Sequence, residues 1–416
     1  MHPHTARYRG LVASATAATL LLAACGGGSD DDDGDIAPAP TTRSTLAVSL
    51  ASNAPACGFD AVNVTISKLR FRQDFNTDPN AAGWTELSFT PAKKLNLLHP
   101  ATTLAGASTA LGEVQLPTGA WTQMQVVFDA AGGSVRPAGA AADVALETAA
   151  ATAAGVRVPV DLKVEDGKKI ELLFEMNACE SIQTRGAAYV FRPRPRLPSL
   201  ATSGIGGFVA PAALAGKPVI TAQKGGTILA TTVPHPTTGE FALPRLPADT
   251  YDVVFQANGR ATAVIGSVPV TAGATTRVGT AGAPIPLATS AVATISGQVS
   301  HVAPNVAPPD GTWIMASQAI TADPAVGNAA TTVTNRLQPV DLATGNYTLP
   351  NLARASIQYA LYKPNTVLTP LNAATSGGNG RYRIEALATG YINKTGASAN
   401  INISSGDAPG VNISMP

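Results

Sequence analysis

Apolar and polar residues alternate along most of the chain after residue 44, with a period of two. This period is typical of strands that bury one face. We find no comparable stretch with the 3.6-residue period of an amphipathic helix, so the sequence predicts an all-β protein. The clearest alternating runs are 46–50, 62–66, 124–128, 156–164 and 170–176.

Two interruptions refine these strands. Leu69 and Phe71 continue the second run one residue out of step, which indicates a β-bulge near Ser67 and Lys68. Pro159 lies within the run 156–164, and because proline cannot donate to a ladder, this strand should lie at a sheet edge.

The connections between the runs carry their own signals. The sequence Glu-Asp-Gly-Lys at 165–168 contains an Asp-Gly pair, which favours a tight turn and predicts a hairpin between the runs on either side. The alanine-rich segment 138–154 has helical propensity, but its glycines favour a loop.

The N-terminal residues read as an export signal. Arg7 and Arg9 precede an uncharged stretch, 11–24, which is shorter than the roughly 20 apolar residues of a membrane span. Leu-Ala-Ala-Cys at 22–25 resembles a bacterial lipobox, in which the cysteine becomes the lipidated first residue of the mature chain. We therefore expect residues 1–24 to be removed and Cys25 to carry lipid. An ordinary secretory signal with a chance cysteine remains the alternative.

An acidic, glycine-rich segment follows Cys25. Glycines and a serine at 26–29 favour flexible chain, and the aspartates at 30–33 and 35 repel one another. A calcium loop with Gly34 at its sixth position would need oxygen ligands where Pro40 stands, so that interpretation fails. Residues 25–43 are predicted to be a tether.

The charge balance and the cysteines limit the partners. Removing residues 1–24 takes away two arginines, so 28 − 2 leaves 26 basic residues against 27 acidic ones. This balance gives no reason to expect nucleic-acid binding. Besides Cys25 the chain contains Cys57 and Cys179, and in an exported protein we expect them to form a disulfide; two buried thiols remain the alternative.

The sequence shows no recognisable catalytic centre. We find no zinc-ligand spacing among the histidines and no G-x-S-x-G or Walker pattern. The glycines of 203–208 miss the dinucleotide-binding spacing. Five acidic residues could in principle pair across a sheet as a glycosidase dyad, but nothing in their spacing selects any two of them. We therefore predict no enzyme activity, no catalytic residue, no cofactor and no metal ligand. The residues weighed are His99, His235, His301, Asp60, Glu86, Glu113, Asp129 and Asp161.

Several blocks in the first half occur in an order that points to a family. They include LAVSLASNAPACGFDAVNVTISKLRFRQ, LPTGAWTQMQVVF and GVRVPVDLKVEDGKKIELLFEMNACESI. Over about residues 44–195 the chain resembles the bacterial family named domain of unknown function 4382. The resemblance implies an exported β-sandwich, commonly found on lipoproteins, and implies no activity.

The second half contains a repeated motif. The pattern T-G-x-aromatic-x-L-P-x-L occurs at 238–246 and again at 344–352. Alternating apolar residues follow each copy. These units resemble the transthyretin-like (prealbumin-like) sandwich of carboxypeptidase regulatory domains, a fold that often carries glycan sites. Before them, FRPRPRLPSL at 191–200 reads as a solvated, semi-rigid linker, with a phosphate-binding stripe of Arg192, Arg194 and Arg196 as the alternative.

These features predict three consecutive β-sandwich domains behind a lipid anchor. The leading hypothesis is a non-enzymatic cell-envelope lipoprotein with a structural or binding role. Its expected location is the outer membrane, facing the periplasm or the exterior, and its partners are the membrane and an unidentified glycan or protein. The alternatives are a carbohydrate-binding surface lipoprotein and an unrecognised hydrolase. The predicted segments are 1–24 (signal peptide), 25–43 (tether), 44–195, 196–288 and 289–416 (sandwiches).

Overall fold

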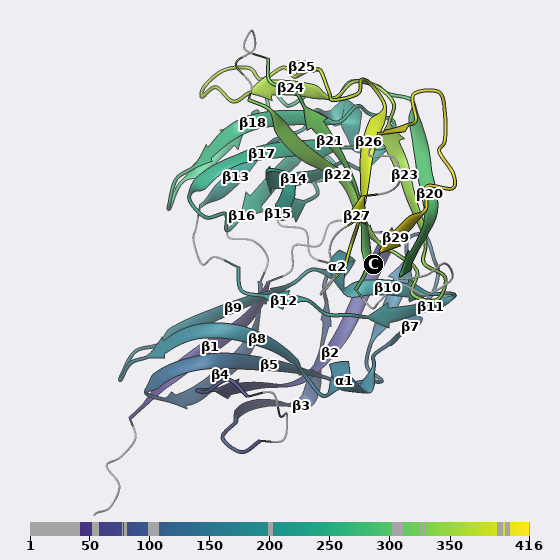
Figure 1. Ribbon diagram of the computed structural model, residues 1–416. Helices are drawn as coiled ribbons and strands as arrows, with labels where there is room; N and C mark the ends of the chain where they lie inside the picture. Colours follow the sequence, from purple (N-terminus) through teal and green to yellow (C-terminus); the bar gives the residue numbers. More distant parts are fainter. Residues whose placement is uncertain are drawn as a thin grey trace, which may run out of the picture. The chain divides into compact units, whose positions relative to one another are not determined.

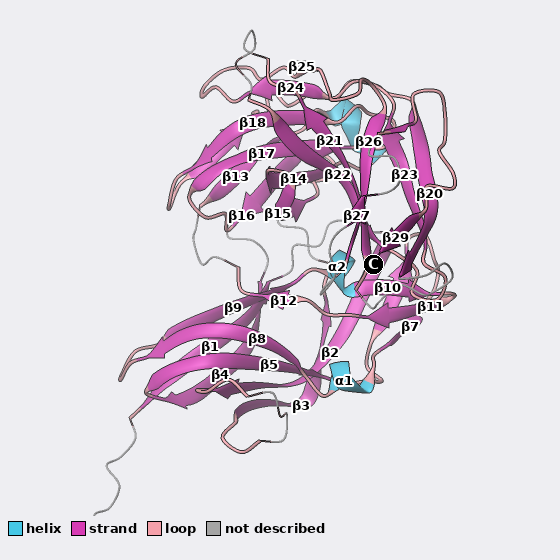
Figure 2. Cartoon of the chain, in the orientation of Figure 1, coloured by secondary structure: helices cyan, strands magenta, loops and turns pink. Residues whose placement is uncertain are grey.

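Strands make up nearly all of the regular structure in the computed structural model (Figures 1 and 2). The structure describes residues 42–51, 58–76, 78, 81–98, 108–198, 203–301, 311–323, 327, 329–388, 394–395 and 400–415. The described part, from Thr42 onward, forms one compact unit. Its helical segments are short: α1 (Ala150–Ala153), α2 (Ala178–Ser181) and a 3-10 turn at Pro211–Gly216. The predicted all-β class is confirmed.

Two sheets form the N-terminal sandwich. The first contains β1 (Arg43–Ala51), β4 (Ser108–Pro117), β9 (Ile170–Met176) and β12 (Pro195–Arg196), in the order β12–β9–β1–β4. The second contains β2 (Phe59–Arg72), β3 (Thr85–Asn96), β5 (Gly119–Phe128), β6 (Ser134–Pro137), β7 (Val144–Glu147), β8 (Val156–Val164), β10 (Ile182–Arg185) and β11 (Ala188–Phe191). Its order is β10–β11–β7–β6–β2–β5–β8, with β3 also paired to β2. Inward-facing residues of both sheets, such as Val48, Phe174, Val64 and Met124, share one core.

Local predictions for this sandwich mostly hold. The register of β2 shifts between Ile66 and Lys68, which confirms the predicted bulge. The strand that contains Pro159, β8, ends the sheet order, as predicted. The hairpin predicted at 165–168 is wrong, because β8 pairs with β5 in one sheet whereas β9 pairs with β1 in the other. The Asp-Gly pair turns the chain, and the turn carries it from one sheet to the other.

The next sandwich has a three-stranded and a six-stranded sheet. The smaller contains β13 (Gly204–Phe208), β16 (Glu240–Pro244) and β19 (Thr275–Val278), with β13 in the middle. The larger contains β14 (Val219–Lys224), β15 (Thr227–Thr232), β17 (Asp249–Gln256), β18 (Ala263–Val270), β24 (Gln358–Leu361) and β25 (Leu371–Asn372). Its order is β15–β14–β17–β18–β24–β25, and residues such as Ile205, Phe241 and Val253 form the core.

The last sandwich follows the same plan. One sheet contains β20 (Val292–His301), β23 (Asn346–Ala353) and β29 (Ile413–Met415), with β20 in the middle. The other contains β21 (Trp313–Ile320), β22 (Thr331–Pro339), β26 (Arg381–Leu387), β27 (Lys394–Thr395) and β28 (Ile401–Asn402). Its order is β22–β21–β26–β27, with β28 also paired to β26. Ile295, Leu349 and Ile384 lie in its core.

Two strands from the second repeat complete the sheet of the first. β24 runs parallel to β18, with Ala263 opposite Gln358 and Gly266 opposite Leu361 (Figure 1). A separate cluster of buried apolar side chains packs at this junction: Val254, Val264, Ile320, Val333, Ile357 and Tyr359. The two C-terminal sandwiches therefore share a sheet rather than being joined only by a linker.

A capped turn explains the start of the repeated motif in the last sandwich. The Oδ1 atom of Asp341 accepts hydrogen bonds from the backbone N–H groups of Ala343 (3.0 Å) and Thr344 (2.9 Å). The Thr344 hydroxyl accepts one from the Asn346 N–H (3.2 Å). Gly345 between them has a φ of 72°, a left-handed value that glycine adopts at little cost.

The first copy of the motif builds the same turn with a different cap. The Nδ1 atom of His235 accepts from the backbone N–H groups of Thr237 and Thr238, both at 3.3 Å. The Thr238 hydroxyl accepts from the Glu240 N–H at 3.3 Å, and Gly239 again has a φ of 72°. His235 is therefore the structural counterpart of Asp341.

Candidate functional site

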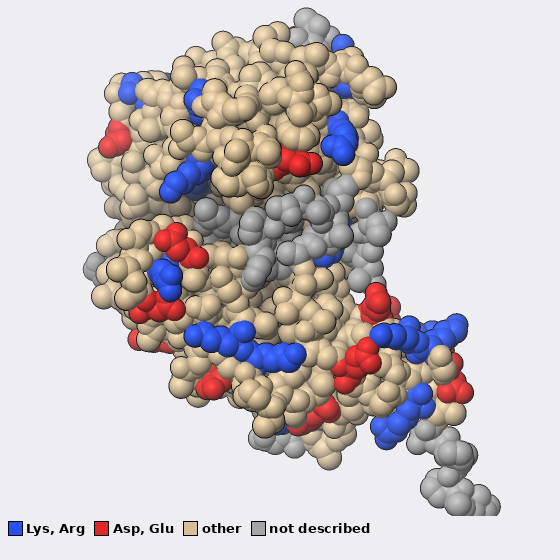
Figure 3. All heavy atoms as spheres, turned by 180° about the vertical axis from the view of Figure 1, so that it is seen from behind, with Lys and Arg blue, Asp and Glu red and all other residues tan. Residues whose placement is uncertain are grey.

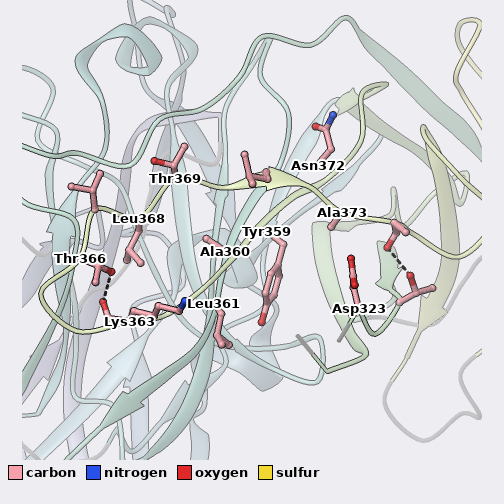
Figure 4. A pocket seen from close by; sticks show the side chains of 14 residues that line it. Asp323, Tyr359, Ala360, Leu361, Lys363, Thr366, Leu368, Thr369, Asn372 and Ala373 are labelled. Atoms are coloured by element: carbon pink, nitrogen blue, oxygen red, sulfur yellow. Dashed lines mark hydrogen bonds between the residues drawn. The ribbon is translucent and has the colours of Figure 1, made fainter. Parts of the chain in front are cut away.

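A hollow of about 210 Å³ opens beside the junction of the two C-terminal sandwiches (Figure 4). Its walls come from the loop after β21, and from β24, β25 and the segments that follow each of them. The segment after β25 holds both sheets together, because the Ala373 N–H donates to Ile357 (2.9 Å) and the Thr321 N–H donates to Ala374 (3.0 Å). This double pairing positions the hollow.

Tyr359 forms the buried wall of the hollow. Its side chain is only 6% exposed, and Gly266 on the neighbouring strand makes room for it, since a Cβ there would lie 1.9 Å from the Tyr359 hydroxyl oxygen. Burial and the negative charge of Asp252 raise the pKa of Tyr359, against a hydrogen bond with Ser267. The phenol therefore stays protonated at neutral pH and acts as a hydrogen-bonding group.

The rim combines apolar and polar side chains. Val367 and Leu371 are 72% and 63% exposed, high values for large apolar residues. The labelled Asp323, Lys363 and Asn372 also line the hollow (Figure 4). A volume below the roughly 300–1,000 Å³ of sites for drug-sized ligands suits a single side chain or sugar unit. The arrangement can bind such a group, and its lining residues do not include a cysteine or histidine nucleophile.

Two other hollows involve the same half of the chain. A groove of about 880 Å³ runs along β21, β22 and β26 and includes Arg381 and Arg383. Arg383 forms an ion pair with Glu385 at 2.7 Å. A cavity of about 310 Å³ is lined by Arg196 and Arg245.

Charges on the molecular surface are mixed. Basic and acidic side chains lie interspersed on the face drawn in Figure 3. Several form exposed ion pairs, including Lys169 with Glu113 at 2.7 Å, while Lys163 and Lys168 both contact Glu165. The hydrogen bond from Lys168, then that from Lys163, and the positive charges of both lysines lower the pKa of Glu165 to about 2.

The acidic residues weighed as a catalytic pair take part in separate local contacts. Asp60 accepts from the Gly139 N–H (2.9 Å), Asp129 caps the Ala131 N–H (3.0 Å), and Glu86 pairs with Lys68 and Arg70. Among the described residues, no group of three or more His, Cys, Asp or Glu side chains is placed to hold a metal ion.

The predicted lipid and disulfide sites lie largely outside the described residues. Residues 1–41, with Cys25, and residues 52–57, with Cys57, are not described. Cys179 is half-buried in α2, where its N–H donates to Asn177 Oδ1 (2.9 Å). The Cys57–Cys179 bridge therefore stays a prediction.

Two arginines of the arginine-proline segment make specific contacts, so the segment is not simply a solvated linker. Arg194 stacks on Trp313, with its guanidinium carbon 5.5 Å from the ring centroid, and donates to the Gly311 carbonyl (3.2 Å). Arg196 lies in β12 and forms a 2.6 Å ion pair with buried Glu175. Alternating prolines hold this segment extended, which lets it pair as a strand.

Two tryptophans of the N-terminal sandwich pack against neighbouring residues. Trp121 is buried and donates to the Pro117 carbonyl (3.0 Å), and half-buried Trp84 stacks with Arg72. His301 is half-buried in β20, and His99 lies outside the described residues. The sequence analysis missed the cap made by His235 and the hollow around Tyr359. Aligning the two copies of the repeated motif places His235 at the position of Asp341 and could have identified the cap.

Residues 43–193 match the family model "Domain of unknown function (DUF4382)". This confirms the family resemblance of the first half. The matched segment ends just before β12 and spans less than half of the chain. A comparison with curated proteins gives no match.

Solved structures with some similarity include pilins. The Bacillus anthracis TIE protein has 9% identity and a TM-score of 0.16, over 86% of this chain and 68% of its own. A streptococcal ancillary pilin has 10% identity and a TM-score of 0.16, over 90% of this chain and 99% of its own. The Corynebacterium diphtheriae major pilin SpaA has 12% identity and a TM-score of 0.15, over 89% of this chain and 99% of its own. Such values carry no argument about function. Within the described residues, no helix is long and apolar enough to span a membrane.

Proposed function

We propose that this chain is a non-enzymatic, lipid-anchored protein of the bacterial cell envelope with a structural or binding role. Residues 22–25 supply the expected processing and lipidation signal, with Cys25 as the anchor. The observation that carries the structural part is the sheet shared by the C-terminal sandwiches, in which β24 extends the sheet of β18. Two β-sandwiches joined by a shared sheet suit a structural role in a protein that is tethered to a membrane.

The anchor is tested by fractionation. Acyl chains contribute about 0.8 kcal/mol per buried CH₂, and stable anchoring takes more than one signal. We expect the wild type to partition into detergent, and Cys25→Ser to be released or left unprocessed. Cys179→Ala serves as the control and should stay with the membrane. A correctly cleaved Cys25→Ser chain that remains membrane-bound would contradict the proposal.

Carbohydrate binding is the second candidate function, and the hollow at Tyr359 favours it. Its lining combines a carboxylate, an ammonium group and an amide with the apolar surfaces of Val367 and Leu371. Sugars present hydroxyl groups and apolar C–H faces that match such a surface. A glycan array should detect binding by the mature chain that Lys363→Ala and Leu371→Ser both weaken. Lys217→Ala, which changes a lysine elsewhere, should leave binding unchanged.

A further inference from the structure

The two most exposed large apolar side chains in the described part of the chain lie beside the hollow at Tyr359. Val367 is 72% exposed and Leu371 is 63% exposed, and both line the hollow. Leu371 belongs to β25, the last strand in the order of its sheet, and therefore stands at a sheet edge. A single apolar residue on a surface is normal, whereas two beside a concave site mark a candidate contact surface.

The hollow can accept one of these side chains from another molecule. Its volume is about 210 Å³, and Leu361, Leu368 and Ala373 contribute apolar walls. The same patch thus carries projecting apolar side chains and a hollow that suits one of them. When two copies meet about a two-fold axis, identical patches face each other, and each projecting side chain meets the hollow of the other copy.

The charges on this patch are complementary to their own rotated copy. Lys363 and Asp323 both line the hollow, and they lie on opposite sides of Tyr359 in Figure 4. A two-fold axis that passes near Tyr359 would place Lys363 of each copy opposite Asp323 of the other. A carboxylate has about four acceptor sites, so Asp323 can accept from a second donor in addition to its contacts within the chain. Opposite charges that face each other favour this register over others.

We infer that this surface, the Leu371 patch (Asp323, Lys363, Val367, Leu371 and the hollow), is the contact between two copies of the chain. Val367 and Leu371 of each copy pack against the hollow of the other, and Lys363 of each copy faces Asp323 of the other. Because the surface is small, the dimer is weak, with a dissociation constant of about 10–100 µM. The inference is independent of the lipid anchor, and it names an occupant for the hollow other than a sugar.

Sedimentation velocity tests the dimer with the mature chain carrying Cys25→Ser, so that lipid cannot drive association. We expect the unaltered patch to give a sedimentation coefficient that rises between about 1 and 300 µM protein. Leu371→Asp should weaken the association by at least about tenfold, because it places a carboxylate in an apolar contact. Phe75→Asp is the matched control, since Phe75 is 62% exposed in the N-terminal sandwich, and it should leave association unchanged. Both variants should keep the melting temperature, because both side chains are exposed.

Charge reversal tests the two-fold geometry. In Lys363→Glu the facing groups are both acidic, and in Asp323→Lys they are both basic. Each variant alone should therefore associate at least about tenfold more weakly than the unaltered patch. An equimolar mixture of the two variants restores opposite charges at both contacts of a heterodimer, and it should associate within about threefold of the unaltered patch.

Four results would overturn the inference. One is a sedimentation coefficient of the unaltered patch that stays constant up to about 300 µM protein. Another is full association of Leu371→Asp, or an equal loss of association in Phe75→Asp. The third is a mixture of the two charge variants, each melting like the unaltered chain, that associates no better than either alone. The fourth is glycan binding that Lys363→Ala weakens in a chain that stays monomeric, which would assign the hollow to a sugar.

Discussion

Gly207 lies in β13 where two backbones approach closely. A Cβ at this position would lie 1.9 Å from the carbonyl oxygen of Val278 on β19. At Gly206, the nearest atom would be the Phe241 carbonyl oxygen at 3.6 Å, an ordinary contact. The glycine-rich stretch 203–208 thus reflects strand packing at Gly207.

These neighbours form a matched pair for mutation. Gly207→Ala must push β13 away from β19, and we expect it to lower the free energy of unfolding by about 1–3 kcal/mol. Gly206→Ala should change it much less. Urea denaturation of the mature chain measures both, and equal effects would show that β13 has room to move.

The cap at His235 gives a second prediction at this scale. Its imidazole Nδ1 accepts two N–H groups at 3.3 Å, while Asp341 accepts its pair at 2.9 and 3.0 Å. We expect His235→Ala to cost about 1 kcal/mol, the usual contribution of a hydrogen bond, and His235→Asp to preserve or increase stability. Thermal melting compares the two, and a lower melting temperature for His235→Asp than for His235→Ala would contradict the cap.

At the scale of the elements, the alternation of apolar and polar residues predicted features that depend only on residues adjacent in the sequence. The bulge near Lys68 and the edge position of β8 were visible because each follows from one local irregularity. The sequence did not show which strands pair with one another in the sheets. The turn at 165–168 signals a reversal but cannot say whether β9 joins the sheet of β8. The hollow at Tyr359 escaped prediction for the same reason, since it depends on β24 meeting β18 across the sequence.

The predicted disulfide gains support from strand pairing. β1 and β9 run parallel, with Ala51 opposite Glu175, so the chain leaves both strands at the same end of the sheet. Cys57 lies six residues after Ala51, and Cys179 lies four residues after Glu175. A bridge requires the two Cα atoms to come within about 4.4–6.8 Å, and it stays a prediction because Cys57 lies outside the described residues.

Removing the bridge should destabilise the first sandwich alone. It would close a loop of about 120 residues, worth roughly 4–5 kcal/mol as an upper figure. We expect Cys57→Ala to lower the melting temperature of the N-terminal sandwich and to free the Cys179 thiol for labelling. Wild-type protein that labels at both cysteines, when freshly exported and never reduced, would rule the bridge out.

At the scale of the whole molecule, the two C-terminal sandwiches share a sheet, so we expect them to fold as one unit. The sequence repeat favours separate domains at 196–288 and 289–416, whereas the structure places β24 and β25 of the second repeat in the sheet of the first. Polar groups reinforce the junction: buried Gln223 donates to the Thr334 carbonyl and accepts from its N–H, both at 2.8 Å. The repeated motif could be recognised in the sequence because each copy is a short local pattern. The pairing of β24 and β25 with the first repeat could not, because it joins strands far apart in the sequence.

We therefore expect a fragment of residues 201–416 to fold and a fragment of residues 201–288 to fail. The longer fragment keeps three apolar clusters, whereas the shorter one loses β24 and uncovers Val254 and Val264, side chains worth about 1.5–3 kcal/mol each when buried. It also leaves Gln223 without its partners on Thr334, a cost of about 1–3 kcal/mol for a buried polar group. Circular dichroism and thermal melting should show a cooperative β-sheet transition only for 201–416. A cooperative transition of 201–288 at the same temperature would mean that the shared sheet adds no stability, and a disordered 201–416 would mean that this half depends on the N-terminal sandwich.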